Sequence, residues 1–350
     1  MLRRYDAVVI DNILLIVGLV AAWLTLRDVF DTVVVPGGSR ASLQVARRLG
    51  QALLPIWKLR GRRRGISGSF APLVLVSSFI IWMSILALAF ALMCFAVRDQ
   101  FAKPIESYWD AVYLSGSALA TVGLSQHVPT GSARWVIIAA GFCGLAVMTM
   151  AVTYLLEVQS SISKRDTGII KLNTAAGNPP SALTLLERFA ALRNRDALRD
   201  DLEEGRNWCA TVRQSHNAHP SLIYFRSIST GAGWPAALGA LLDLALIAEH
   251  LIDDDGLFGP AILLRQEGSR MAQELALVAR LDRKPANTNE AELRQVAQRL
   301  SSIGYPVRAS PDFAAMVAVR DEYVGCVDAI ADHLGKPTAL LLRKDEAPRC

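Results

Sequence analysis

The sequence predicts an all-α membrane protein, and two observations lead to this fold class. Hydrophobic residues make up 52% of the 350 residues and the mean hydropathy is +0.30, which is too apolar for an ordinary soluble chain. Three long runs of residues are also apolar and nearly free of charge, and each is about as long as a helix needs to cross a bilayer. We therefore expect three transmembrane helices, followed by a soluble helical region.

The three apolar runs cover residues 7–26, 70–97 and 135–156. The second and third contain no charged residue, whereas the first carries Asp11 near its start. Asp11 has two interpretations: a functional acid inside the membrane, or an interfacial residue if the helix begins later in the chain. Residues 1–26 could also be a cleaved signal peptide, but no small-x-small cleavage site follows the apolar run.

Basic residues predict the orientation of these helices, because short cytoplasmic loops are enriched in Lys and Arg. Residues 1–156 contain 14 Lys and Arg against 7 Asp and Glu, whereas residues 157–350 contain 23 against 25. Most of this excess lies between the first two apolar runs, at Arg27, Arg40, Arg47, Arg48, Lys58, Arg60, Arg62, Arg63 and Arg64. We therefore expect the N-terminus and residues 98–134 outside, and residues 28–69 and the region after 157 in the cytoplasm.

The basic linker at residues 28–69 is predicted to contact lipid. Between residues 41 and 60, apolar and basic side chains alternate as in a helix that lies in the inner headgroup layer, broken near Pro55. The alternative is a linker held near the bilayer by charge alone. In either case the partner of residues 40–64 is anionic lipid, and the position of the charge argues against a nucleic acid.

The most informative stretch is the loop between the second and third apolar runs. Residues 107–120 are compatible with a short helix, and Thr121, Val122, Gly123, Leu124 and Ser125 follow without a polar spacer. Gln126 and Pro129 come next. Irregular backbone at membrane depth is tolerated only where protein buries it or where it lines a path for water.

Residues 70–157 resemble the pore domain of the potassium-channel superfamily. The resemblance rests on the order of two spans, a pore helix that opens with Tyr108 and Trp109, and the Thr121-Val122-Gly123 sequence with a proline shortly after. It implies a re-entrant pore helix, a filter loop and a homotetramer in a bacterial inner membrane. The function implied is a cation channel that prefers K⁺, with no catalytic activity and no cofactor besides the permeant K⁺.

In such a filter, rings of backbone carbonyls from four copies replace the water around the ion. The resemblance assigns this coordination to Thr121, Val122, Gly123, Leu124 and Ser125, with Gln126 at the pore mouth. Gly123 would allow the left-handed backbone that turns adjacent carbonyls to one axis. In the inner helix, Gly141 and Gly144 are candidate gating hinges, and close helix packing is the alternative.

Three residues depart from the family filter, which reads Thr-Val-Gly-Tyr-Gly-Asp. Leu124 replaces the tyrosine, Ser125 the second glycine and Gln126 the acid. A left-handed backbone at Ser125 would cost about 1–2 kcal/mol per subunit. These departures leave open weakly selective cation passage, or a non-conducting membrane sensor or scaffold that acts through its cytoplasmic region.

The chain after residue 157 has the composition of a soluble helical domain. Apolar spacing predicts helices in residues 181–214, 234–251, 261–281, 290–303 and 311–334, with 234–251 as a buried core helix. No Gly-x-Gly-x-x-Gly turn appears, so we expect no dinucleotide binding and assign the region a regulatory or assembly role with an unknown ligand or protein partner. The predicted organisation is thus residues 1–27, 28–69, 70–157 and 158–350: first span, basic linker, pore domain and helical domain.

Overall fold

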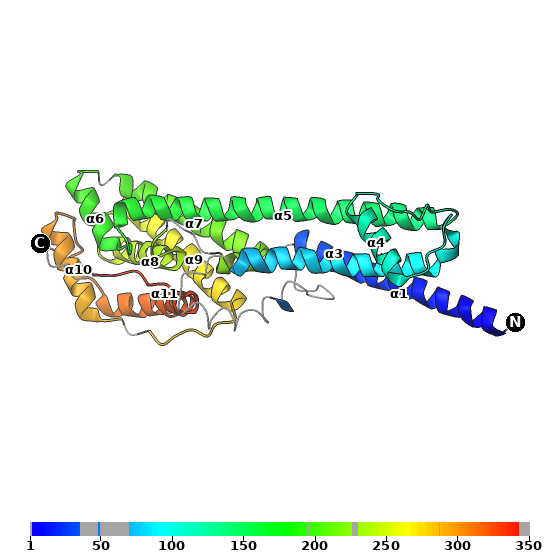
Figure 1. Cartoon of the computed structure of the whole chain (residues 1–350). Coiled ribbons are helices and arrows are strands. Elements are labelled where there is room, and N and C mark those ends of the chain that lie inside the picture. Colours follow the sequence, from blue (N-terminus) through cyan, green and yellow to red (C-terminus); the bar gives the residue numbers. More distant parts are fainter. Residues whose placement is uncertain are drawn as a thin grey trace, which may run out of the picture. The chain divides into compact units, whose positions relative to one another are not determined.

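The computed structural model of the chain describes residues 2–35, 48–49, 70–194, 196–225, 230–286 and 288–342. These residues are mostly helical, and the β pairings among them are two isolated bridges, Phe101 with Pro129 and Ile252 with Val307. The chain divides into an N-terminal unit, Met1–Val158, and a C-terminal unit, Gln159–Cys350 (Figure 1). The predicted all-α fold class is confirmed. The predicted interfacial helix at 41–60 lies outside the described residues, except for positions 48 and 49.

The N-terminal unit is built on two long helices, α1 (Leu2–Val33) and α3 (Phe70–Ala96), which pack side by side (Figure 1). Both are long and apolar enough to cross a membrane, as is α5 (Ala133–Ala176). The close approach of α1 to α3 depends on Gly18, since a Cβ there would lie 2.6 Å from the backbone oxygen of Ala89. Small residues allow this kind of backbone contact between apolar helices.

Two polar pairs join α1 to α3 and to the residues that follow α3. Their order along the chain shows that the two helices run in opposite directions. The indole nitrogen of Trp82 donates to Asp28 at 2.8 Å, and both side chains are buried. Near the other end, Arg98 donates to the two carboxylate oxygens of Asp11 at 2.5 and 3.2 Å. This hydrogen bond raises the pKa of Arg98. Asp11 therefore has a structural partner just beyond the end of α3.

Helix α1 extends further than the predicted span of residues 7–26. The charged residues after Leu26 mark the end of an apolar run in the sequence, but the helix accommodates them. Arg27 pairs with Asp31 one turn later at 3.7 Å, and Asp28 is buried against Trp82. The helix therefore continues to Val33, because each of these charged residues has a partner.

Helix α5 also continues beyond the predicted span of residues 135–156. Its apolar part is followed by polar residues that favour a helix, and it ends at Ala176. Gly177 then adopts a left-handed backbone (φ +81°), and Pro179 and Pro180 follow. These are standard helix stop signals, and residues 157–176 contain no proline and only one glycine, Gly168. The helix therefore begins in the N-terminal unit and ends in the C-terminal unit.

The C-terminal unit is a helical domain with its own apolar core. Its helices after α5 are α6 (Ala182–Ala191), α7 (Ala197–Ala218), η3 (Pro220–Tyr224), α8 (Trp234–His250), α9 (Asp255–Val278), α10 (Glu290–Ser302) and α11 (Phe313–Leu334). In α8 every residue from Trp234 to Glu249 is buried, so the prediction of a core helix is confirmed. The predicted helical stretch at 181–214 is two helices, α6 and α7.

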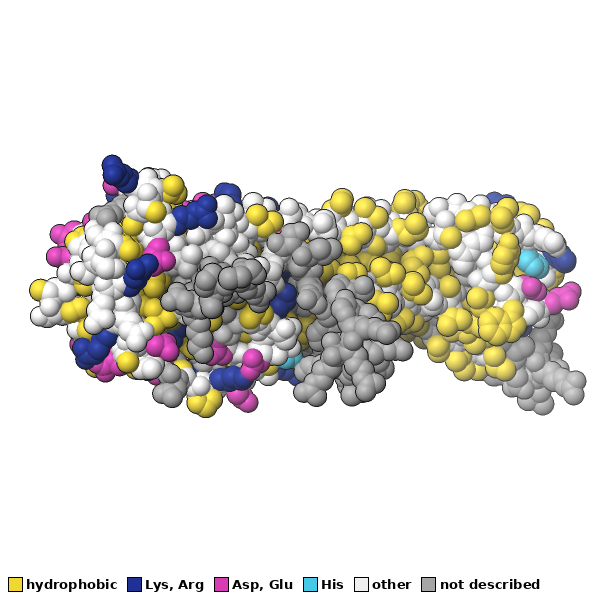
Figure 2. Space-filling model, turned by 60° about the vertical axis from the view of Figure 1, so that its left-hand side comes forward, with side chains coloured by type: hydrophobic (Ala, Val, Ile, Leu, Met, Phe, Trp, Pro, Cys, Tyr) yellow, Lys and Arg dark blue, Asp and Glu magenta, His cyan; other side chains and the backbone are white. Residues whose placement is uncertain are grey.

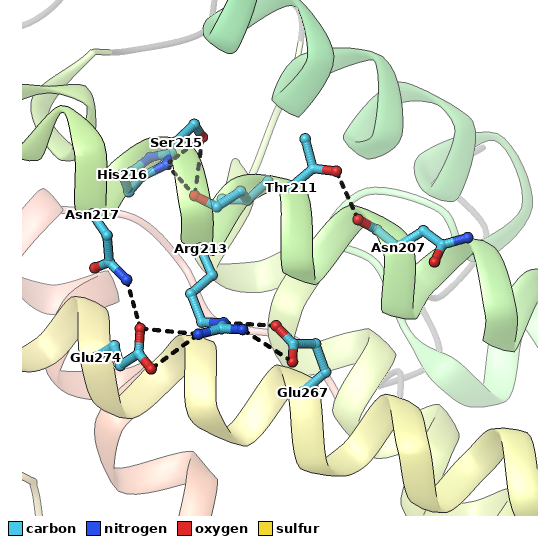
Figure 3. Close-up of polar contacts among 9 residues, drawn as sticks. Asn207, Thr211, Arg213, Ser215, His216, Asn217, Glu267 and Glu274 are labelled. Atoms are coloured by element: carbon cyan, nitrogen blue, oxygen red, sulfur yellow. Dashed lines mark hydrogen bonds and ion pairs between the residues drawn. The ribbon is translucent and has the colours of Figure 1, made fainter. Parts of the chain in front are cut away.

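Charged side chains fasten the outer helices of this unit to one another. Arg213 of α7 donates to Glu267 and Glu274 of α9, and the amide of Asn217 also donates to Glu274 (Figure 3). A second pair lies deeper, where Arg320 of α11 donates to the buried Asp243 of α8 at 2.9 and 3.2 Å. On the face shown in Figure 2, hydrophobic side chains cover much of the described N-terminal unit, whereas charged ones are spread over the C-terminal unit.

Candidate functional site

The candidate site begins with α4 (Tyr108–Leu119), the short helix predicted at residues 107–120. Ser107 caps its N-terminus, since its hydroxyl oxygen accepts from the backbone N–H of Trp109 at 3.2 Å. The buried side chains of α4 include Ala111 and Leu114, which join a cluster with Cys94 of α3. Packing against α3 therefore sets the position of this helix.

The last turn of α4 is held from the other side by α5. A Cβ on Gly144 would lie 2.0 Å from the backbone oxygen of Leu119, whereas a Cβ on Gly141 would lie 3.7 Å from that of Ala118. No Cβ can occupy a position 2.0 Å from a carbonyl oxygen, so the absence of a side chain at Gly144 is what allows the contact. The sequence left hinge and packing roles open for both glycines. For Gly144, the contact favours packing.

After α4 the backbone turns sharply and then extends. The N–H groups of Val122 and Gly123 both donate to the backbone oxygen of Ser117, at 2.9 and 3.3 Å. Gly123 has a φ of +71°, the left-handed conformation for which glycine was expected there. Thr121 also has a positive φ, +57°, which is costly for a β-branched residue. The segment is therefore held in a strained turn by the end of the helix.

Two details of this turn differ from what the sequence suggested. Ser125 does not adopt a left-handed backbone, so the strain considered for it falls instead on Thr121. Ser117 was not singled out, yet its backbone oxygen accepts both turn N–H groups. Its hydroxyl is buried and has no hydrogen-bond partner in the described part of the chain. Sequence alone gave no signal for either feature, because both depend on the path of the turn.

The segment that follows is fastened at its C-terminal end to residues 98–105. Thr130 N–H donates to the backbone oxygen of Gln100 at 2.8 Å, and Ala102 N–H donates to that of Val128 at 2.9 Å. His127 Nδ1 lies 2.8 Å from the backbone oxygen of Lys103. Because a carbonyl oxygen only accepts, this nitrogen carries the proton. Both ends of the candidate filter are thus tied to the same unit.

Between these anchors, the predicted filter residues are exposed in the single chain. Residues 120–126 are all exposed, and the exposed fractions of Val122 and Leu124 are 58% and 61%. The structure places Thr121, Val122, Gly123, Leu124, Ser125 and Gln126 consecutively along this one exposed segment. Among the described residues, no group of three or more His, Cys, Asp and Glu side chains lies close enough to hold a metal ion.

A helix, an exposed irregular segment and a second long apolar helix, joined in this order beside α3, are the parts of an ion-conducting pore. Residues 73–160 match the family described as "Ion channel". We refer to residues 73–160 as the ion-channel segment, after this match. The matched residues run from α3, through α4 and the exposed segment, to the apolar part of α5.

The chain is also similar to an "Uncharacterized membrane protein YdjJ" of Bacillus subtilis (strain 168). The two are 29% identical over 124 residues, which cover 32% of this chain and 36% of that protein. The chain thus spans little more than a third of the relative's length. No solved structure matches the chain. The three apolar helices, the ion-channel segment and this relative together identify a membrane protein.

Proposed function

We propose that the protein is a homotetrameric cation channel that prefers K⁺ and carries a passive ion flux. The carbonyls of Thr121, Val122, Gly123 and Leu124, the Thr121 hydroxyl and Ser125 would coordinate the ions, and Gln126 would lie at the pore mouth. No catalytic step is part of this proposal. The observation that carries it is the exposed, strained segment at residues 120–126, directly after α4 and within an ion-channel segment.

The exposure of this segment supports a pore through a physical argument. Exposed backbone polar groups between apolar spans cannot face lipid, because each group without a hydrogen-bond partner costs several kcal/mol there. They can instead face water, ions or other copies of the chain. In an ion path bounded by several copies, the carbonyls face ions, and the neighbouring copies cover the sides of each segment.

The apolar part of α5 supports assembly of several copies. Large side chains on this helix are exposed in the single chain, with exposed fractions of 73% for Trp135 and 69% for Phe142. Lipid can cover some of this surface, but lipid cannot enclose an ion path. Four copies with their α5 helices around one axis would supply the closed wall that one copy lacks.

Orientation and location complete the proposal. The basic residues between the first two spans favour a cytoplasmic linker, which places the N-terminus outside and the C-terminal unit inside. The membrane would be a bacterial inner membrane, where residues 40–64 meet anionic lipid. The C-terminal unit would act as the regulatory or assembly domain of the channel.

The test compares two glycines that receive the same added methyl group. Full-length protein in liposomes should show K⁺ flux above Na⁺ flux under imposed gradients. Gly123→Ala should abolish the flux, because the φ of +71° disfavours a side chain. Gly116→Ala should conduct normally, since a Cβ at Gly116 in α4 meets nothing within 4 Å and its φ is not positive. Full flux through Gly123→Ala tetramers would contradict the filter assignment.

A second candidate function is a membrane sensor or scaffold that does not conduct. The replacements at Ser125 and Gln126 favour it, because they remove the second glycine and the acid of the family filter. The double variant Ser125→Gly/Gln126→Asp distinguishes the two proposals. If the protein is a channel whose filter selects weakly because of these replacements, the double variant should gain selectivity for K⁺ over Na⁺. A protein in which both forms are silent, while tetramers and folded C-terminal units are present, would favour the sensor.

A further inference from the structure

A cavity of about 70 Å³ opens on the surface of the C-terminal unit, and none of its lining residues belongs to the ion-channel segment. It lies where the end of α5 meets α6, α7 and α8. Apolar side chains form most of its lining: Leu172, Ala175, Leu185, Trp208, Leu241 and Leu244. An apolar hollow this size is large enough for a short hydrocarbon group, because an enclosed 150 Å³ cavity holds benzene.

The glycines and the tryptophan of the lining fix the shape of this cavity. A Cβ on Gly168 would lie 2.1 Å from the Trp208 ring, so the indole can rest directly on the backbone of α5. The Trp208 indole N–H donates to the backbone oxygen of Arg165 at 2.9 Å, which holds the ring in place. Gly205 is likewise packed against Leu241. The wall is thus rigid, and the cavity is a built feature of the fold.

Charged residues at the rim leave one negative charge without a partner. Lys171 and Glu204 pair across the rim at 2.6 Å, so their charges compensate each other. The carboxylate of the half-buried Asp201 makes no ion pair or hydrogen bond within the described ranges. Burial raises the pKa of Asp201, and the nearby Glu204 and Asp200 raise it further. Because the Asp201 carboxylate is the unpaired charge of the lining, the rim is electronegative beside an apolar floor.

We propose that this cavity is a binding site for a small organic monocation, an alkylammonium whose hydrocarbon chain fills the apolar floor and whose ammonium lies beside Asp201. The net charge of the rim matches one positive charge. Asp201 would repel an anion, and a neutral apolar molecule would leave the Asp201 carboxylate without a partner. The site is independent of the proposed channel activity, since it lies wholly in the C-terminal unit.

Chain length tests the apolar half of the site. Titration calorimetry of the detergent-solubilised full chain with ethyl-, propyl-, butyl- and hexylammonium should show saturable binding. Affinity should rise roughly fourfold for each added methylene until the cavity is full, and should then level off. Equal affinity along the series, or no saturable binding, would overturn the proposal.

Three charge variants test the polar half with butylammonium as the probe. Asp201→Asn should weaken binding at least tenfold. Asp200→Asn is the matched control: this neighbouring acid is exposed and does not line the cavity, so binding should weaken far less than in Asp201→Asn. Lys171→Gln should tighten binding severalfold, because it leaves Glu204 as a second negative charge. An Asp201→Asn variant that binds like the parent chain would overturn the site, whatever the other variants show.

Ala175→Leu tests the cavity without changing any charge. Its larger side chain would occupy the floor, so butylammonium binding should be lost while the far-ultraviolet circular dichroism stays that of the parent chain. Undiminished binding to this variant would place the probe elsewhere and overturn the proposal. If Ala175→Leu fails to fold, the Asp201, Asp200 and Lys171 variants still decide the outcome.

Discussion

Helix α8 in the C-terminal unit and the apolar part of α5 in the N-terminal unit have similar side chains but very different surroundings. The chain itself buries α8 from Trp234 to Glu249, whereas Trp135 and Phe142 of α5 are largely exposed. The C-terminal unit thus completes its own core. The N-terminal unit leaves its apolar surface to be covered by lipid or by further copies of the chain.

The two units also differ in how their polar residues find partners. In the C-terminal unit the buried carboxylate of Asp243 is paired with Arg320 of the same chain and accepts a hydrogen bond from the hydroxyl of Tyr323 at 2.7 Å. In the ion-channel segment, residues 120–126 are uncharged and exposed, and the hydroxyls of Thr121 and Ser125 make only local hydrogen bonds, to Ala120 and His127. A self-sufficient unit should therefore fail when one internal partner is removed, and the ion-channel segment should fail when its backbone geometry is changed.

The largest effect is expected from Asp243→Ala. This change leaves the largely buried guanidinium of Arg320 without its carboxylate partner, which should lower the free energy of unfolding of the C-terminal unit by about 3–5 kcal/mol. Hydrogen exchange of the α8 and α11 amides in the detergent-solubilised chain measures it. The exposed Asp253→Ala should change protection by less than about 0.5 kcal/mol. Equal protection in the two variants would mean that the buried pair does not hold the unit.

A pH dependence follows from His216 of α7, which is buried (Figure 3). Its Nδ1 donates to the backbone oxygen of Val212 at 2.8 Å, and burial, with the charge of Arg165, lowers its pKa to about 3. Above pH about 6.5 it is neutral in both states. As the pH falls from about 6.5 towards 3, only the unfolded chain takes up the proton, so stability falls by up to about 1.4 kcal/mol per pH unit.

The measurement for His216 is the free energy of exchange of the α7 amides at pH 7, 5.5 and 4.5, corrected for intrinsic exchange rates. His216→Gln should be less stable at pH 7, because its fit to the core is poorer, but should lose much of the slope below pH 6.5. His127→Gln, in the other unit, should keep the slope. An unchanged slope in His216→Gln would assign the pH dependence to other groups.

A smaller free-energy change, with a clear effect on flux, is expected at Gly144. The Cβ of Gly144→Ala would lie 2.0 Å from the backbone oxygen of Leu119, so the last turn of α4 must move, at a cost of about 1–3 kcal/mol. K⁺ flux should fall at least tenfold. Gly141→Ala, with ordinary contact at 3.7 Å, should conduct. Loss of flux in Gly141→Ala with normal flux in Gly144→Ala would contradict the packing role.

Sequence patterns predicted those parts of the molecule that depend on local order along the chain. Uninterrupted apolar runs located α3 and α8, and the motif around Thr121 and Gly123 located the candidate filter. The parts that were missed depend on contacts between distant residues. The extension of α1 needed the pairing of Asp28 with Trp82. The sequence left two roles open for Gly144, and its contact with Leu119 was needed to favour packing over a hinge.

The smallest effect is expected at Trp82, and it tests whether α1 is held to α3 by a polar contact as well as by packing. Trp82→Phe removes the indole N–H that donates to Asp28 and keeps an aromatic ring in the same place. Hydrogen bonds between transmembrane helices contribute about 0.5–2 kcal/mol, so stability in detergent should fall by about 1 kcal/mol. Trp135→Phe is the matched control, since that ring is 73% exposed. A loss at Trp135 equal to that at Trp82 would show that bulk, and not the bond to Asp28, sets the effect. A loss confined to Trp82 would mean that even the N-terminal unit, which leaves most of its apolar surface uncovered, secures its first helix with an internal polar partner.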